Sequence, residues 1–421
     1  MPDNPFAFPD GQWPGPGGGA HPNGGAIEAE VDPLVSSAEL RGLLGTAMRM
    51  HSQLSDINLT PGRLPQVEVG GALQQVELGQ WKHPLQPEDT EAIADAIIGN
   101  DAKLRATFEE SGSTDCAVEL DCGTRFRVNI FRARDEVSIV LRILPQEIPT
   151  IERLGLPAGI AQIPPIRDGL VLVTGATGSG KSTTLAAIVN EINATRPVHI
   201  VTLEDPVEFS HPHKAGTINQ RELGRDFHDF SVGLRAALRQ APKVILVGEM
   251  RDRETMEIGL KAAETGHLVL STLHTVRAGD AIHRIGGMFD GPEQGLIRSR
   301  LAQVLRFVVG QRLLPKQGGG RVAALEILGN NLRVRNLIEN GEDAENTFPG
   351  VIADNRPRGW QTFDHHIVEH YVAGRIDAEV ALAYCADRSE VQRQIDKVKN
   401  QRGQATSDIG DLQMENVRTR K

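Results

Sequence analysis

Cysteine is scarce in this 421-residue sequence: only Cys116, Cys122 and Cys385 occur, and no two of them form a C-x-x-C pair. Because structural zinc sites are commonly built from such pairs, the sequence argues against one. The odd number and wide spacing indicate reduced thiols, as in a cytoplasmic protein, rather than a disulfide framework. We expect Cys116 and Cys122 to pack as small apolar side chains.

Long apolar runs are missing too. No segment reaches the ~18 consecutive apolar residues that suggest a membrane span, and the first residues lack the basic and apolar regions of a signal peptide. We therefore expect a cytoplasmic protein with no direct membrane span, which associates with a membrane only through partners. The net charge of −10 argues mildly against a protein that grips nucleic-acid phosphates, so no nucleic-acid partner is expected.

The first third of the chain divides into an arm and a small domain. Residues 1–33 are rich in glycine and proline, so this arm is expected to be disordered. Helical apolar spacing, a hairpin and alternating strands then predict an α+β domain over 34–145. Its expected elements are a helix at 38–50, a hairpin at 65–73 with Gly70-Gly71 as the turn, a helix at 87–98, and strands at 125–130 and 136–143.

The rest of the chain contains a larger domain. A proline-rich linker over 146–168 leads to residues 169–385, where strand-like runs alternate with helices. This alternation favours an α/β domain with a parallel sheet. Residues 386–421 are polar, and we expect a helix followed by a loose tail.

One motif carries most of the functional information. Gly175-Ala176-Thr177-Gly178-Ser179-Gly180-Lys181-Ser182 fits the phosphate-binding pattern G-x-x-x-x-G-K-[ST], in which backbone amides surround a polyphosphate. Lys181 supplies a charge at the β- and γ-phosphates, and the Ser182 hydroxyl is a ligand for Mg²⁺. An apolar strand over 169–174 precedes the loop and a helix follows it, which adds the helix dipole to the amide cradle. The candidate nucleotide-binding residues are Gly175, Thr177, Gly178, Ser179, Gly180, Lys181, Ser182 and Thr183.

Acidic residues follow two further apolar strands. Glu204 ends the strand over 198–203, and Glu249 follows the strand that begins at Lys243. In α/β sheets, ligands bind at the carboxyl ends of strands, so both are candidates to hold Mg²⁺ or to activate water. Gly248 stands where a Walker B aspartate is usual, which makes Glu249 the best general base. The alternatives are a solvated acidic turn at Glu204 and an ion pair between Glu249 and Arg251.

A histidine and several arginines complete the candidate set. His274 ends the strand over 267–275, where it would reach a γ-phosphate or the attacking water, although a lone histidine is more often structural. Arginine fingers stabilise charge on transferring phosphates, often from a neighbouring subunit. The candidates for that role are Arg125, Arg127, Arg142 and, more weakly, Arg284. A solvated strand face is the alternative for the first three.

These motifs resemble, in their order, the four boxes of the secretion ATPase superfamily. The boxes, called Walker A, Asp box, Walker B and His box, are matched by 175–182, 204–209, 248–252, and 265–267 with 272–275. Several linking segments are similar to one branch, the type IV pilus retraction ATPases (PilT-like). These segments are 125–129, 218–222, 318–324, 335–338 and 361–364, and the resemblance covers roughly residues 34–380.

The resemblance implies a fold, a site and partners. It implies a PAS-like N-terminal domain, a RecA-like P-loop ATPase domain and a homo-hexameric ring that binds ATP with Mg²⁺ and turns an inner-membrane platform protein. It further implies that Lys181 and Ser182 hold phosphates and Mg²⁺, and that His274 senses the γ-phosphate. Glu249 and Glu204 would act on Mg²⁺ and water. Arg125, Arg127 and Arg142 would be arginine contacts.

The chain departs from the family pattern in three places. The family box A-I-R-N-L-I-R-E reads Arg333-Val334-Arg335-Asn336-Leu337-Ile338-Glu339-Asn340, an insertion occupies about 341–358, and the N-terminal arm is unlike the compact pattern. The tetracysteine zinc insert of the extension and secretion branches is absent.

The function favoured by these residues is an ATP-hydrolysing motor for pilus retraction and twitching motility. A type IVB secretion or conjugation ATPase (DotB-like or TraJ-like) is the alternative, because these ATPases also lack the zinc insert. A non-hydrolysing nucleotide-gated regulator or scaffold is the alternative from another class, and the complete acid set argues against it. The negative net charge of the chain disfavours a DNA translocase.

Overall fold

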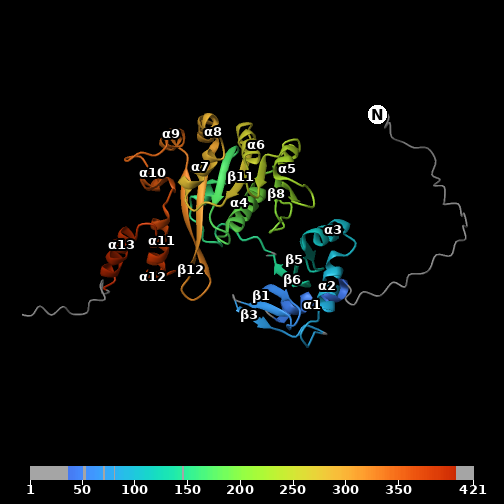
Figure 1. The fold of residues 1–421 in the computed structure, drawn as a ribbon. Helices are drawn as coiled ribbons and strands as arrows, with labels where there is room; N and C mark the ends of the chain where they lie inside the picture. The colour runs from blue at the N-terminus through green and yellow to red at the C-terminus, as the bar shows by residue number, and fades with distance from the viewer. Residues whose placement is uncertain (1–36, 51–53, 70–71, 80, 145–146, 404–421) are drawn as a thin grey trace, which may run out of the picture. The chain divides into compact units, whose positions relative to one another are not determined.

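The computed structural model describes residues 37–50, 54–69, 72–79, 81–144 and 147–403, which form two compact units (Figure 1). One unit consists of the described residues up to Thr114 together with Ile130–Val140, and the other of Asp115–Asn129 and Leu141 onward. The predicted N-terminal arm, the Gly70-Gly71 turn and the tail beyond residue 403 lie outside the described residues. The domain boundaries stay a prediction.

A six-stranded sheet, in the order β3-β2-β1-β6-β5-β4, comes first along the chain. Strand β2 pairs antiparallel with β1 and with β3, as the hairpin pattern predicted. The strands are β1 Leu54–Leu59, β2 Gln66–Val69, β3 Ala72–Gln75, β4 Ser113–Glu119, β5 Arg125–Ala133 and β6 Glu136–Ile143, and the helices are α1 Ser37–Met50, α2 Pro87–Ile98 and α3 Ala102–Ser111. Helix α2 begins with Pro87, whose fixed φ suits a first helical position, and acids follow in its first turn.

A seven-stranded sheet, in the order β13-β12-β7-β11-β10-β8-β9, forms the larger part. Its strands are β7 Gly169–Thr174, β8 His199–Glu204, β9 Thr217–Glu222, β10 Val244–Val247, β11 Leu268–Leu273, β12 Leu305–Pro315 and β13 Arg321–Gly329. All neighbouring pairs are parallel except β12 and β13, which form an antiparallel hairpin at one edge. The sheet is therefore mixed, whereas the alternating pattern predicted a parallel one; the fold class, an α/β domain after an α+β part, is confirmed.

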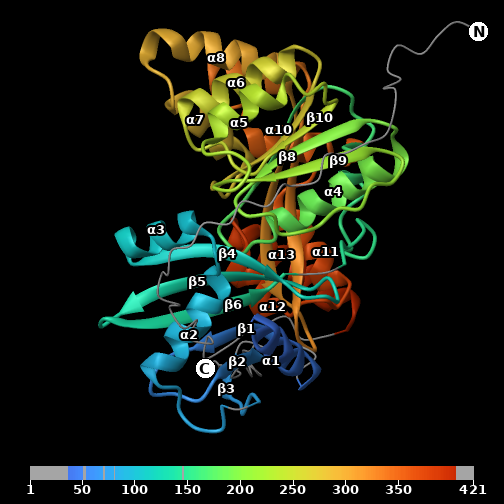
Figure 2. The same ribbon diagram turned by 90° about the vertical axis from the view of Figure 1, so that its right-hand side faces the viewer.

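Helices cover both faces of this sheet, which explains why its central strands are continuously apolar. In β7, Leu170 and Leu172 belong to one hydrophobic cluster, while Val171 and Val173 belong to the other. Helix α4 packs on one face and α5 to α8 on the opposite one (Figure 2). The helix bounds are α4 Lys181–Thr195, α5 Phe230–Ala237, α6 Arg253–Glu264, α7 Ala278–Gly287, α8 Gly291–Val304, α9 Leu332–Asn340 and α10 Phe348–Asp354.

The last three helices form a separate small cluster with the far ends of β12 and β13. They are α11 Phe363–Val372, α12 Ala378–Tyr384 and α13 Arg388–Gln401, and two short 3-10 turns, η1 Ile160–Gln162 and η2 Arg356–Arg358, occur earlier in the chain. Phe363 and Ile367 of α11 pack on Leu314 and Ala324 of the hairpin. The helix predicted after residue 386 is confirmed as α13.

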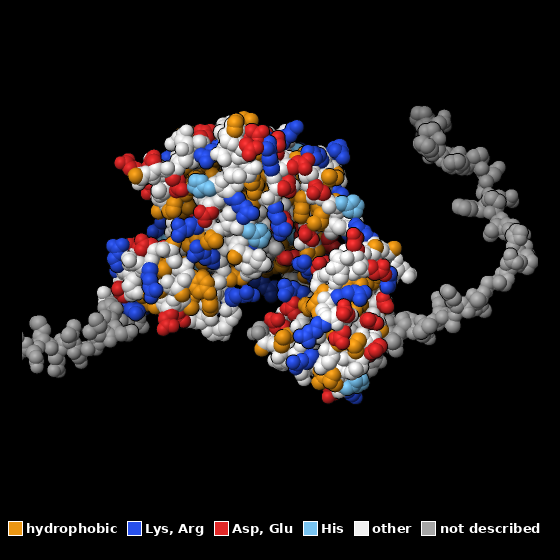
Figure 3. All heavy atoms as spheres, in the orientation of Figure 1, with side chains coloured by type: hydrophobic (Ala, Val, Ile, Leu, Met, Phe, Trp, Pro, Cys, Tyr) orange, Lys and Arg blue, Asp and Glu red, His pale blue; other side chains and the backbone are white. Residues whose placement is uncertain are grey.

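Basic and acidic side chains are interspersed over the face shown in Figure 3. The three cysteines form no disulfide. Cys116 is half-buried, but Cys122 is exposed, so the expectation that it packs as an apolar side chain is wrong. Among the described residues, every helix is too short or too polar to cross a bilayer.

The close approach of Gly329 to Trp360 predicts a measurable loss of stability for Gly329→Ala. A Cβ at this position would overlap the indole ring of Trp360, which is itself buried against the sheet. Because overpacking a filled core forces neighbours to move, we expect a loss of about 1–3 kcal/mol in the free energy of unfolding. Urea titration followed by circular dichroism measures it. Gly287→Ala, where a Cβ meets no atom within 4 Å, is the matched control; equal stability of the two variants would contradict the packing account.

Candidate functional site

The phosphate-binding loop joins the buried strand β7 to helix α4, as predicted. Lys181 is the first residue of α4, and its Nζ donates to the carbonyl oxygens of Gly175 and Ala176, each at 2.9 Å. Gly180 caps the helix with φ of 86°, a left-handed conformation that glycine adopts without strain. Thr177, Gly178 and Ser182 are exposed, Thr183 is half-buried, and Lys181 and Ser179 are buried. The loop therefore presents an exposed outer rim and a buried ammonium group.

Gln311 of β12 fixes the inner side of the loop, and sequence reasoning missed it. Its Oε1 accepts a hydrogen bond from Thr184 Oγ1 at 2.7 Å, and its Nε2 donates to the Ser179 carbonyl oxygen at 2.8 Å. The side chain is buried, so these bonds are shielded from water. The available signal was a polar residue inside the apolar run of β12.

Three buried hydroxyl groups near the loop have no hydrogen-bond partner among the described residues. They are Thr174 Oγ1 at the end of β7, Ser179 Oγ within the loop, and Thr275 Oγ1 just after β11. Buried polar atoms are rarely left unpaired, and those that are deserve an explanation such as a bound ligand. These hydroxyl groups come from the end of β7, from the phosphate loop and from the residues just after β11. Their positions agree with a polar ligand at this edge of the sheet.

Glu249 follows β10 and lies between a histidine and an arginine. Its Oε2 is 3.6 Å from His274 Nε2 and 2.5 Å from Arg251 Nε, and its side chain is only 15% exposed. The ion pair with Arg251, one of the alternatives, is therefore formed. Arg251 is 69% exposed, and such surface pairs contribute little. The pair and a role for Glu249 toward water are thus compatible.

Electrostatic coupling joins Lys181, Glu249 and His274. Burial lowers the pKa of Lys181, and the nearby carboxylates of Glu208 and Glu249 oppose that shift. Burial, and then the charge of Lys181, lower the pKa of His274, while Glu249 again opposes the shift. His274 is consequently neutral at pH 7, when it can donate from one ring nitrogen and accept at the other.

Close packing explains the glycine at the Walker B position. Gly248 N donates to the Leu203 carbonyl oxygen, and a Cβ on Gly248 would stand 3.1 Å from that same oxygen. Gly248 also accepts, through its carbonyl oxygen, a hydrogen bond from Thr272 Oγ1 at 2.7 Å. The backbones of β8, β10 and β11 therefore approach closely at Gly248, and the carboxylate is carried by the next residue.

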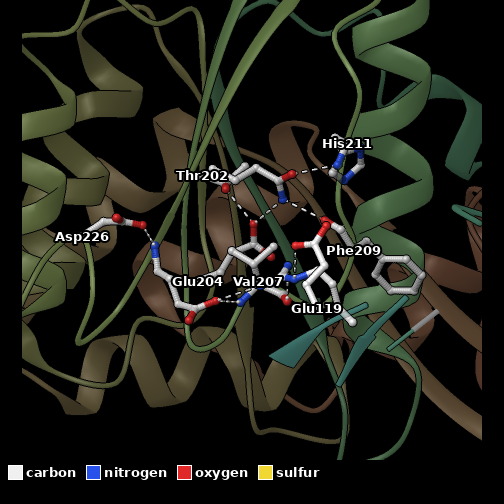
Figure 4. A network of polar contacts seen from close by, with 10 residues as sticks. Glu119, Thr202, Glu204, Val207, Phe209, His211 and Asp226 are labelled. Atoms are coloured by element: carbon white, nitrogen blue, oxygen red, sulfur yellow. Dashed lines mark hydrogen bonds and ion pairs between the residues drawn. The ribbon is translucent and has the colours of Figure 1, made fainter. Parts of the chain in front are cut away.

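Glu204, at the end of β8, is held by its own neighbours (Figure 4). Its Oε1 accepts from Thr202 Oγ1 at 2.6 Å and from Gln220 Nε2 at 3.0 Å. Burial is the main cause that raises the pKa of the Glu204 carboxyl. The carboxylate acting electrostatically on Lys181 from this segment is instead Glu208, another of the three carboxylates that follow this strand in the sequence.

The four candidate arginines differ in how they are held. The Arg125 side chain is 17% exposed and lies 3.6 Å from Glu222 and 3.9 Å from Glu119, and it donates to the Val207 carbonyl oxygen at 3.4 Å. Arg127 pairs with Asp115 at 3.8 Å. Burial raises the pKa of Asp205, and the charge of Arg127 opposes that shift. Arg142 is exposed.

Arg284 lies next to His274. Its Nη1 donates to the carbonyl oxygen of His274 at 3.5 Å, so it adjoins the predicted sensor. Among the four arginines, Arg284 is the one that the structure brings to His274 through a direct contact.

The described residues contain no group of three or more His, Cys, Asp or Glu side chains that could hold a metal by themselves. Mg²⁺ does not require such a cage, because it is usually bound through one or two carboxylates together with substrate phosphates and water. The oxygen donors near the loop, Ser182 and Glu249, are of the type that Mg²⁺ takes. The donor set fits a magnesium ion that is bound together with a nucleotide.

A phosphate-binding loop between a buried parallel strand and a helix, with carboxylates at neighbouring strand ends, defines a P-loop nucleoside triphosphatase. A family model described as type II/IV secretion system protein matches residues 111–346. The type IV pilus retraction ATPase PilT of Pseudomonas aeruginosa is 42% identical over 327 residues, which cover 78% of this chain and 93% of that protein. A twitching motility protein of Neisseria gonorrhoeae is 41% identical, covering 75% and 83%. The chain belongs to the type II/IV secretion ATPase family and is a PilT-like member of it.

Solved structures agree with this assignment. A crystal structure of the pilus retraction motor PilT with bound ADP superimposes with a TM-score of 0.75 at 41% identity, covering 84% of this chain and 99% of that one. The ATPase DotB of Legionella pneumophila gives a TM-score of 0.71 at 28% identity, covering 83% and 95%. The resemblance inferred from the sequence motifs is confirmed, and the protein is an ATPase.

The contacts of Gln311 predict weaker nucleotide binding in Gln311→Met. Methionine has a similar shape but would leave the Ser179 carbonyl and the Thr184 hydroxyl without their partner. Because an unsatisfied buried group costs about 1–3 kcal/mol, we expect ADP affinity to fall at least about tenfold. Fluorescent ADP titration measures this. Gln311→Glu would set a buried carboxylate against the Ser179 carbonyl oxygen and beside the phosphate loop, so it should bind ADP no better than Gln311→Met; unchanged affinity in both variants would contradict the role.

Proposed function

We propose that this protein hydrolyses ATP as a homo-hexameric ring on the cytoplasmic side of the inner membrane and thereby drives retraction of a type IV pilus. The observation that carries the proposal is the strand-end carboxylate Glu249, which adjoins His274 and acts on Lys181 of the phosphate loop. This arrangement suits hydrolysis rather than nucleotide binding alone. The identity to PilT over most of the chain supports pilus retraction as the output.

Each residue of the site has its own role in ATP hydrolysis. Lys181 leaves its loop carbonyls to neutralise charge on the β- and γ-phosphates, where preorganised charge stabilises the transition state. Glu249 orients water for in-line attack on the γ-phosphorus and takes up its proton as the bond to ADP breaks. His274, neutral at pH 7, hydrogen-bonds the γ-phosphate or that water. Ser182 directly, and Glu249 through water, would hold Mg²⁺, which would supply charge neutralisation to the phosphates.

The remaining predicted residues support this site. Glu204 is proposed to act through water, since its Oε1 is already occupied by Thr202 and Gln220. Arg125, Arg127 and Arg142 are proposed to reach the nucleotide of a neighbouring subunit, and Arg284 to support His274. The ring is proposed to act on a platform protein of the inner membrane.

The position of Glu249 predicts a variant that binds but does not turn over. Glu249→Gln keeps the size of the side chain but removes its basicity, so we expect ATP affinity to remain and phosphate release to fall about 10²–10⁴-fold. Lys181→Ala should instead lose affinity, activity or both. Glu254→Gln, an exposed glutamate of α6 paired with Arg235, is the control and should retain activity. Near wild-type turnover in Glu249→Gln would remove this residue from the mechanism.

Deletion of the gene in its native host tests the output. Retraction stalls without its motor, so we expect excess surface pili and lost twitching, restored by the wild-type gene but not by the Glu249→Gln variant. Electron microscopy of pili and a twitching assay measure this. Normal pili together with failed conjugation or effector export would instead assign the ATPase to the secretion branch, to which the likeness to DotB also extends.

A further inference from the structure

A cavity of about 1000 Å³ lies at the opposite end of the sheet from the phosphate loop. Its lining includes Arg306 and Phe307 at the start of β12 and Gly329 at the end of β13. Arg306 contacts Asp168, the residue before β7, whereas the phosphate loop follows the last residue of β7. Because β7 has six residues, the two places are separated by roughly 20 Å. The cavity is therefore distinct from the nucleotide site.

Four arginines line this cavity and no lining residue carries a carboxylate, although the protein as a whole has a net charge of −10. Arg306 pairs with Asp168, and Arg356 Nη2 is 2.6 Å from His365 Nε2. The guanidinium groups of Arg335 and Arg358 form no hydrogen bond and no ion pair with the other described residues. Unused guanidinium donors that line one cavity are suited to an anion, most of all to phosphate, which arginine binds in a bidentate manner.

The cavity wall is fixed before any ligand arrives. Gln162 Nε2 donates to the Arg358 carbonyl oxygen at 2.9 Å, and Ile327 and Gln361 form an isolated β-bridge just beyond Trp360. Trp360 is buried against Gly329 with no room for a Cβ between them. A preformed wall reduces the ordering cost of binding. It also buries the aromatic rings of Phe307 and Trp360, so the accessible lining mixes apolar groups with amide groups, and its charged groups are the arginines.

Two of the arginines come from a segment that sets this chain apart from its family pattern. Arg356 and Arg358 lie at the end of the insertion over about 341–358, whereas Arg335 belongs to 335–338, which resembles the family. The nucleotide site uses none of these residues. The cavity is thus separate from the nucleotide site.

We propose that this cavity binds a small anion with at least two phosphate charges, independently of ATP. Arg335 and Arg358 supply the principal contacts and Arg356 adds charge, whereas Asp168 offsets the charge of Arg306. The phosphate belongs either to a soluble phosphoester or to a lipid headgroup, since the recognising chemistry is the same. The proposal does not depend on the output of the motor.

Calorimetric titration of inorganic pyrophosphate into the full chain, with ADP saturating the phosphate loop, tests the site. We expect one pyrophosphate per chain, with an affinity that falls as salt is raised. In the double variant Arg335→Ala/Arg358→Ala the affinity should fall at least about tenfold, because charge-assisted hydrogen bonds are lost. Arg333→Ala is the matched control: Arg333 lies on the same helix, is exposed and pairs with Asp354 outside the cavity. If the double variant fails to fold, Arg358→Gln alone serves.

Three outcomes would overturn the proposal. They are the absence of pyrophosphate binding to the ADP-loaded wild type, equal binding by wild type and arginine variants, and binding of a polyglutamate peptide in place of pyrophosphate. Cosedimentation with phosphatidylglycerol vesicles distinguishes the two sources of phosphate. Recruitment that depends on Arg335 and Arg358 assigns a lipid headgroup, and its absence, with pyrophosphate bound, assigns a soluble phosphoester.

Discussion

Strand β7 forms parallel hydrogen bonds with both β11 and β12, and this pairing fixes the positions of the groups in the nucleotide site. Because parallel strands end at the same edge of a sheet, the end of β7 delivers the phosphate loop beside His274 from β11 and Gln311 from β12. Glu249 arrives one strand further along, after β10. The apolar residues on both faces of these strands hold the edge in place. The site therefore needs little local structure of its own beyond the glycine-rich turn.

Partial burial of opposite charges gives this edge its chemistry. Burial disfavours the ammonium form of Lys181, and Glu249 and Glu208 offset part of that effect. His274 is kept neutral by burial and by Lys181, so it remains a hydrogen-bonding group rather than another cation. A polyphosphate that enters this edge meets one fixed positive charge, a helix N-terminus and unpaired hydroxyls. The same groups become more effective as water is excluded.

The sequence was sufficient for features that depend on local pattern. The apolar strands, the loop at 175–182 and the acids at strand ends follow from periodicity and residue type, and the structure has them as expected. Three features did not follow. Gln311 lies 132 residues beyond Ser179 of the loop that it holds. The antiparallel pairing of β13 depends on a hairpin register that the apolar pattern of the strands does not specify. The sequence also did not tell which carboxylate of 204–208 acts on Lys181: it is Glu208, while Glu204 is hydrogen-bonded to Thr202 and Gln220.

The central claim is that the edge formed by these strands breaks the γ-phosphate bond rather than only holding a nucleotide. Phosphate release from ATP by the purified wild-type chain, followed over time with and without Mg²⁺, tests it most directly. We predict many Mg²⁺-dependent turnovers per chain, abolished by a chelator. Tight ATP binding with no release of phosphate beyond the uncatalysed rate would contradict it and would define the protein as a nucleotide-gated regulator.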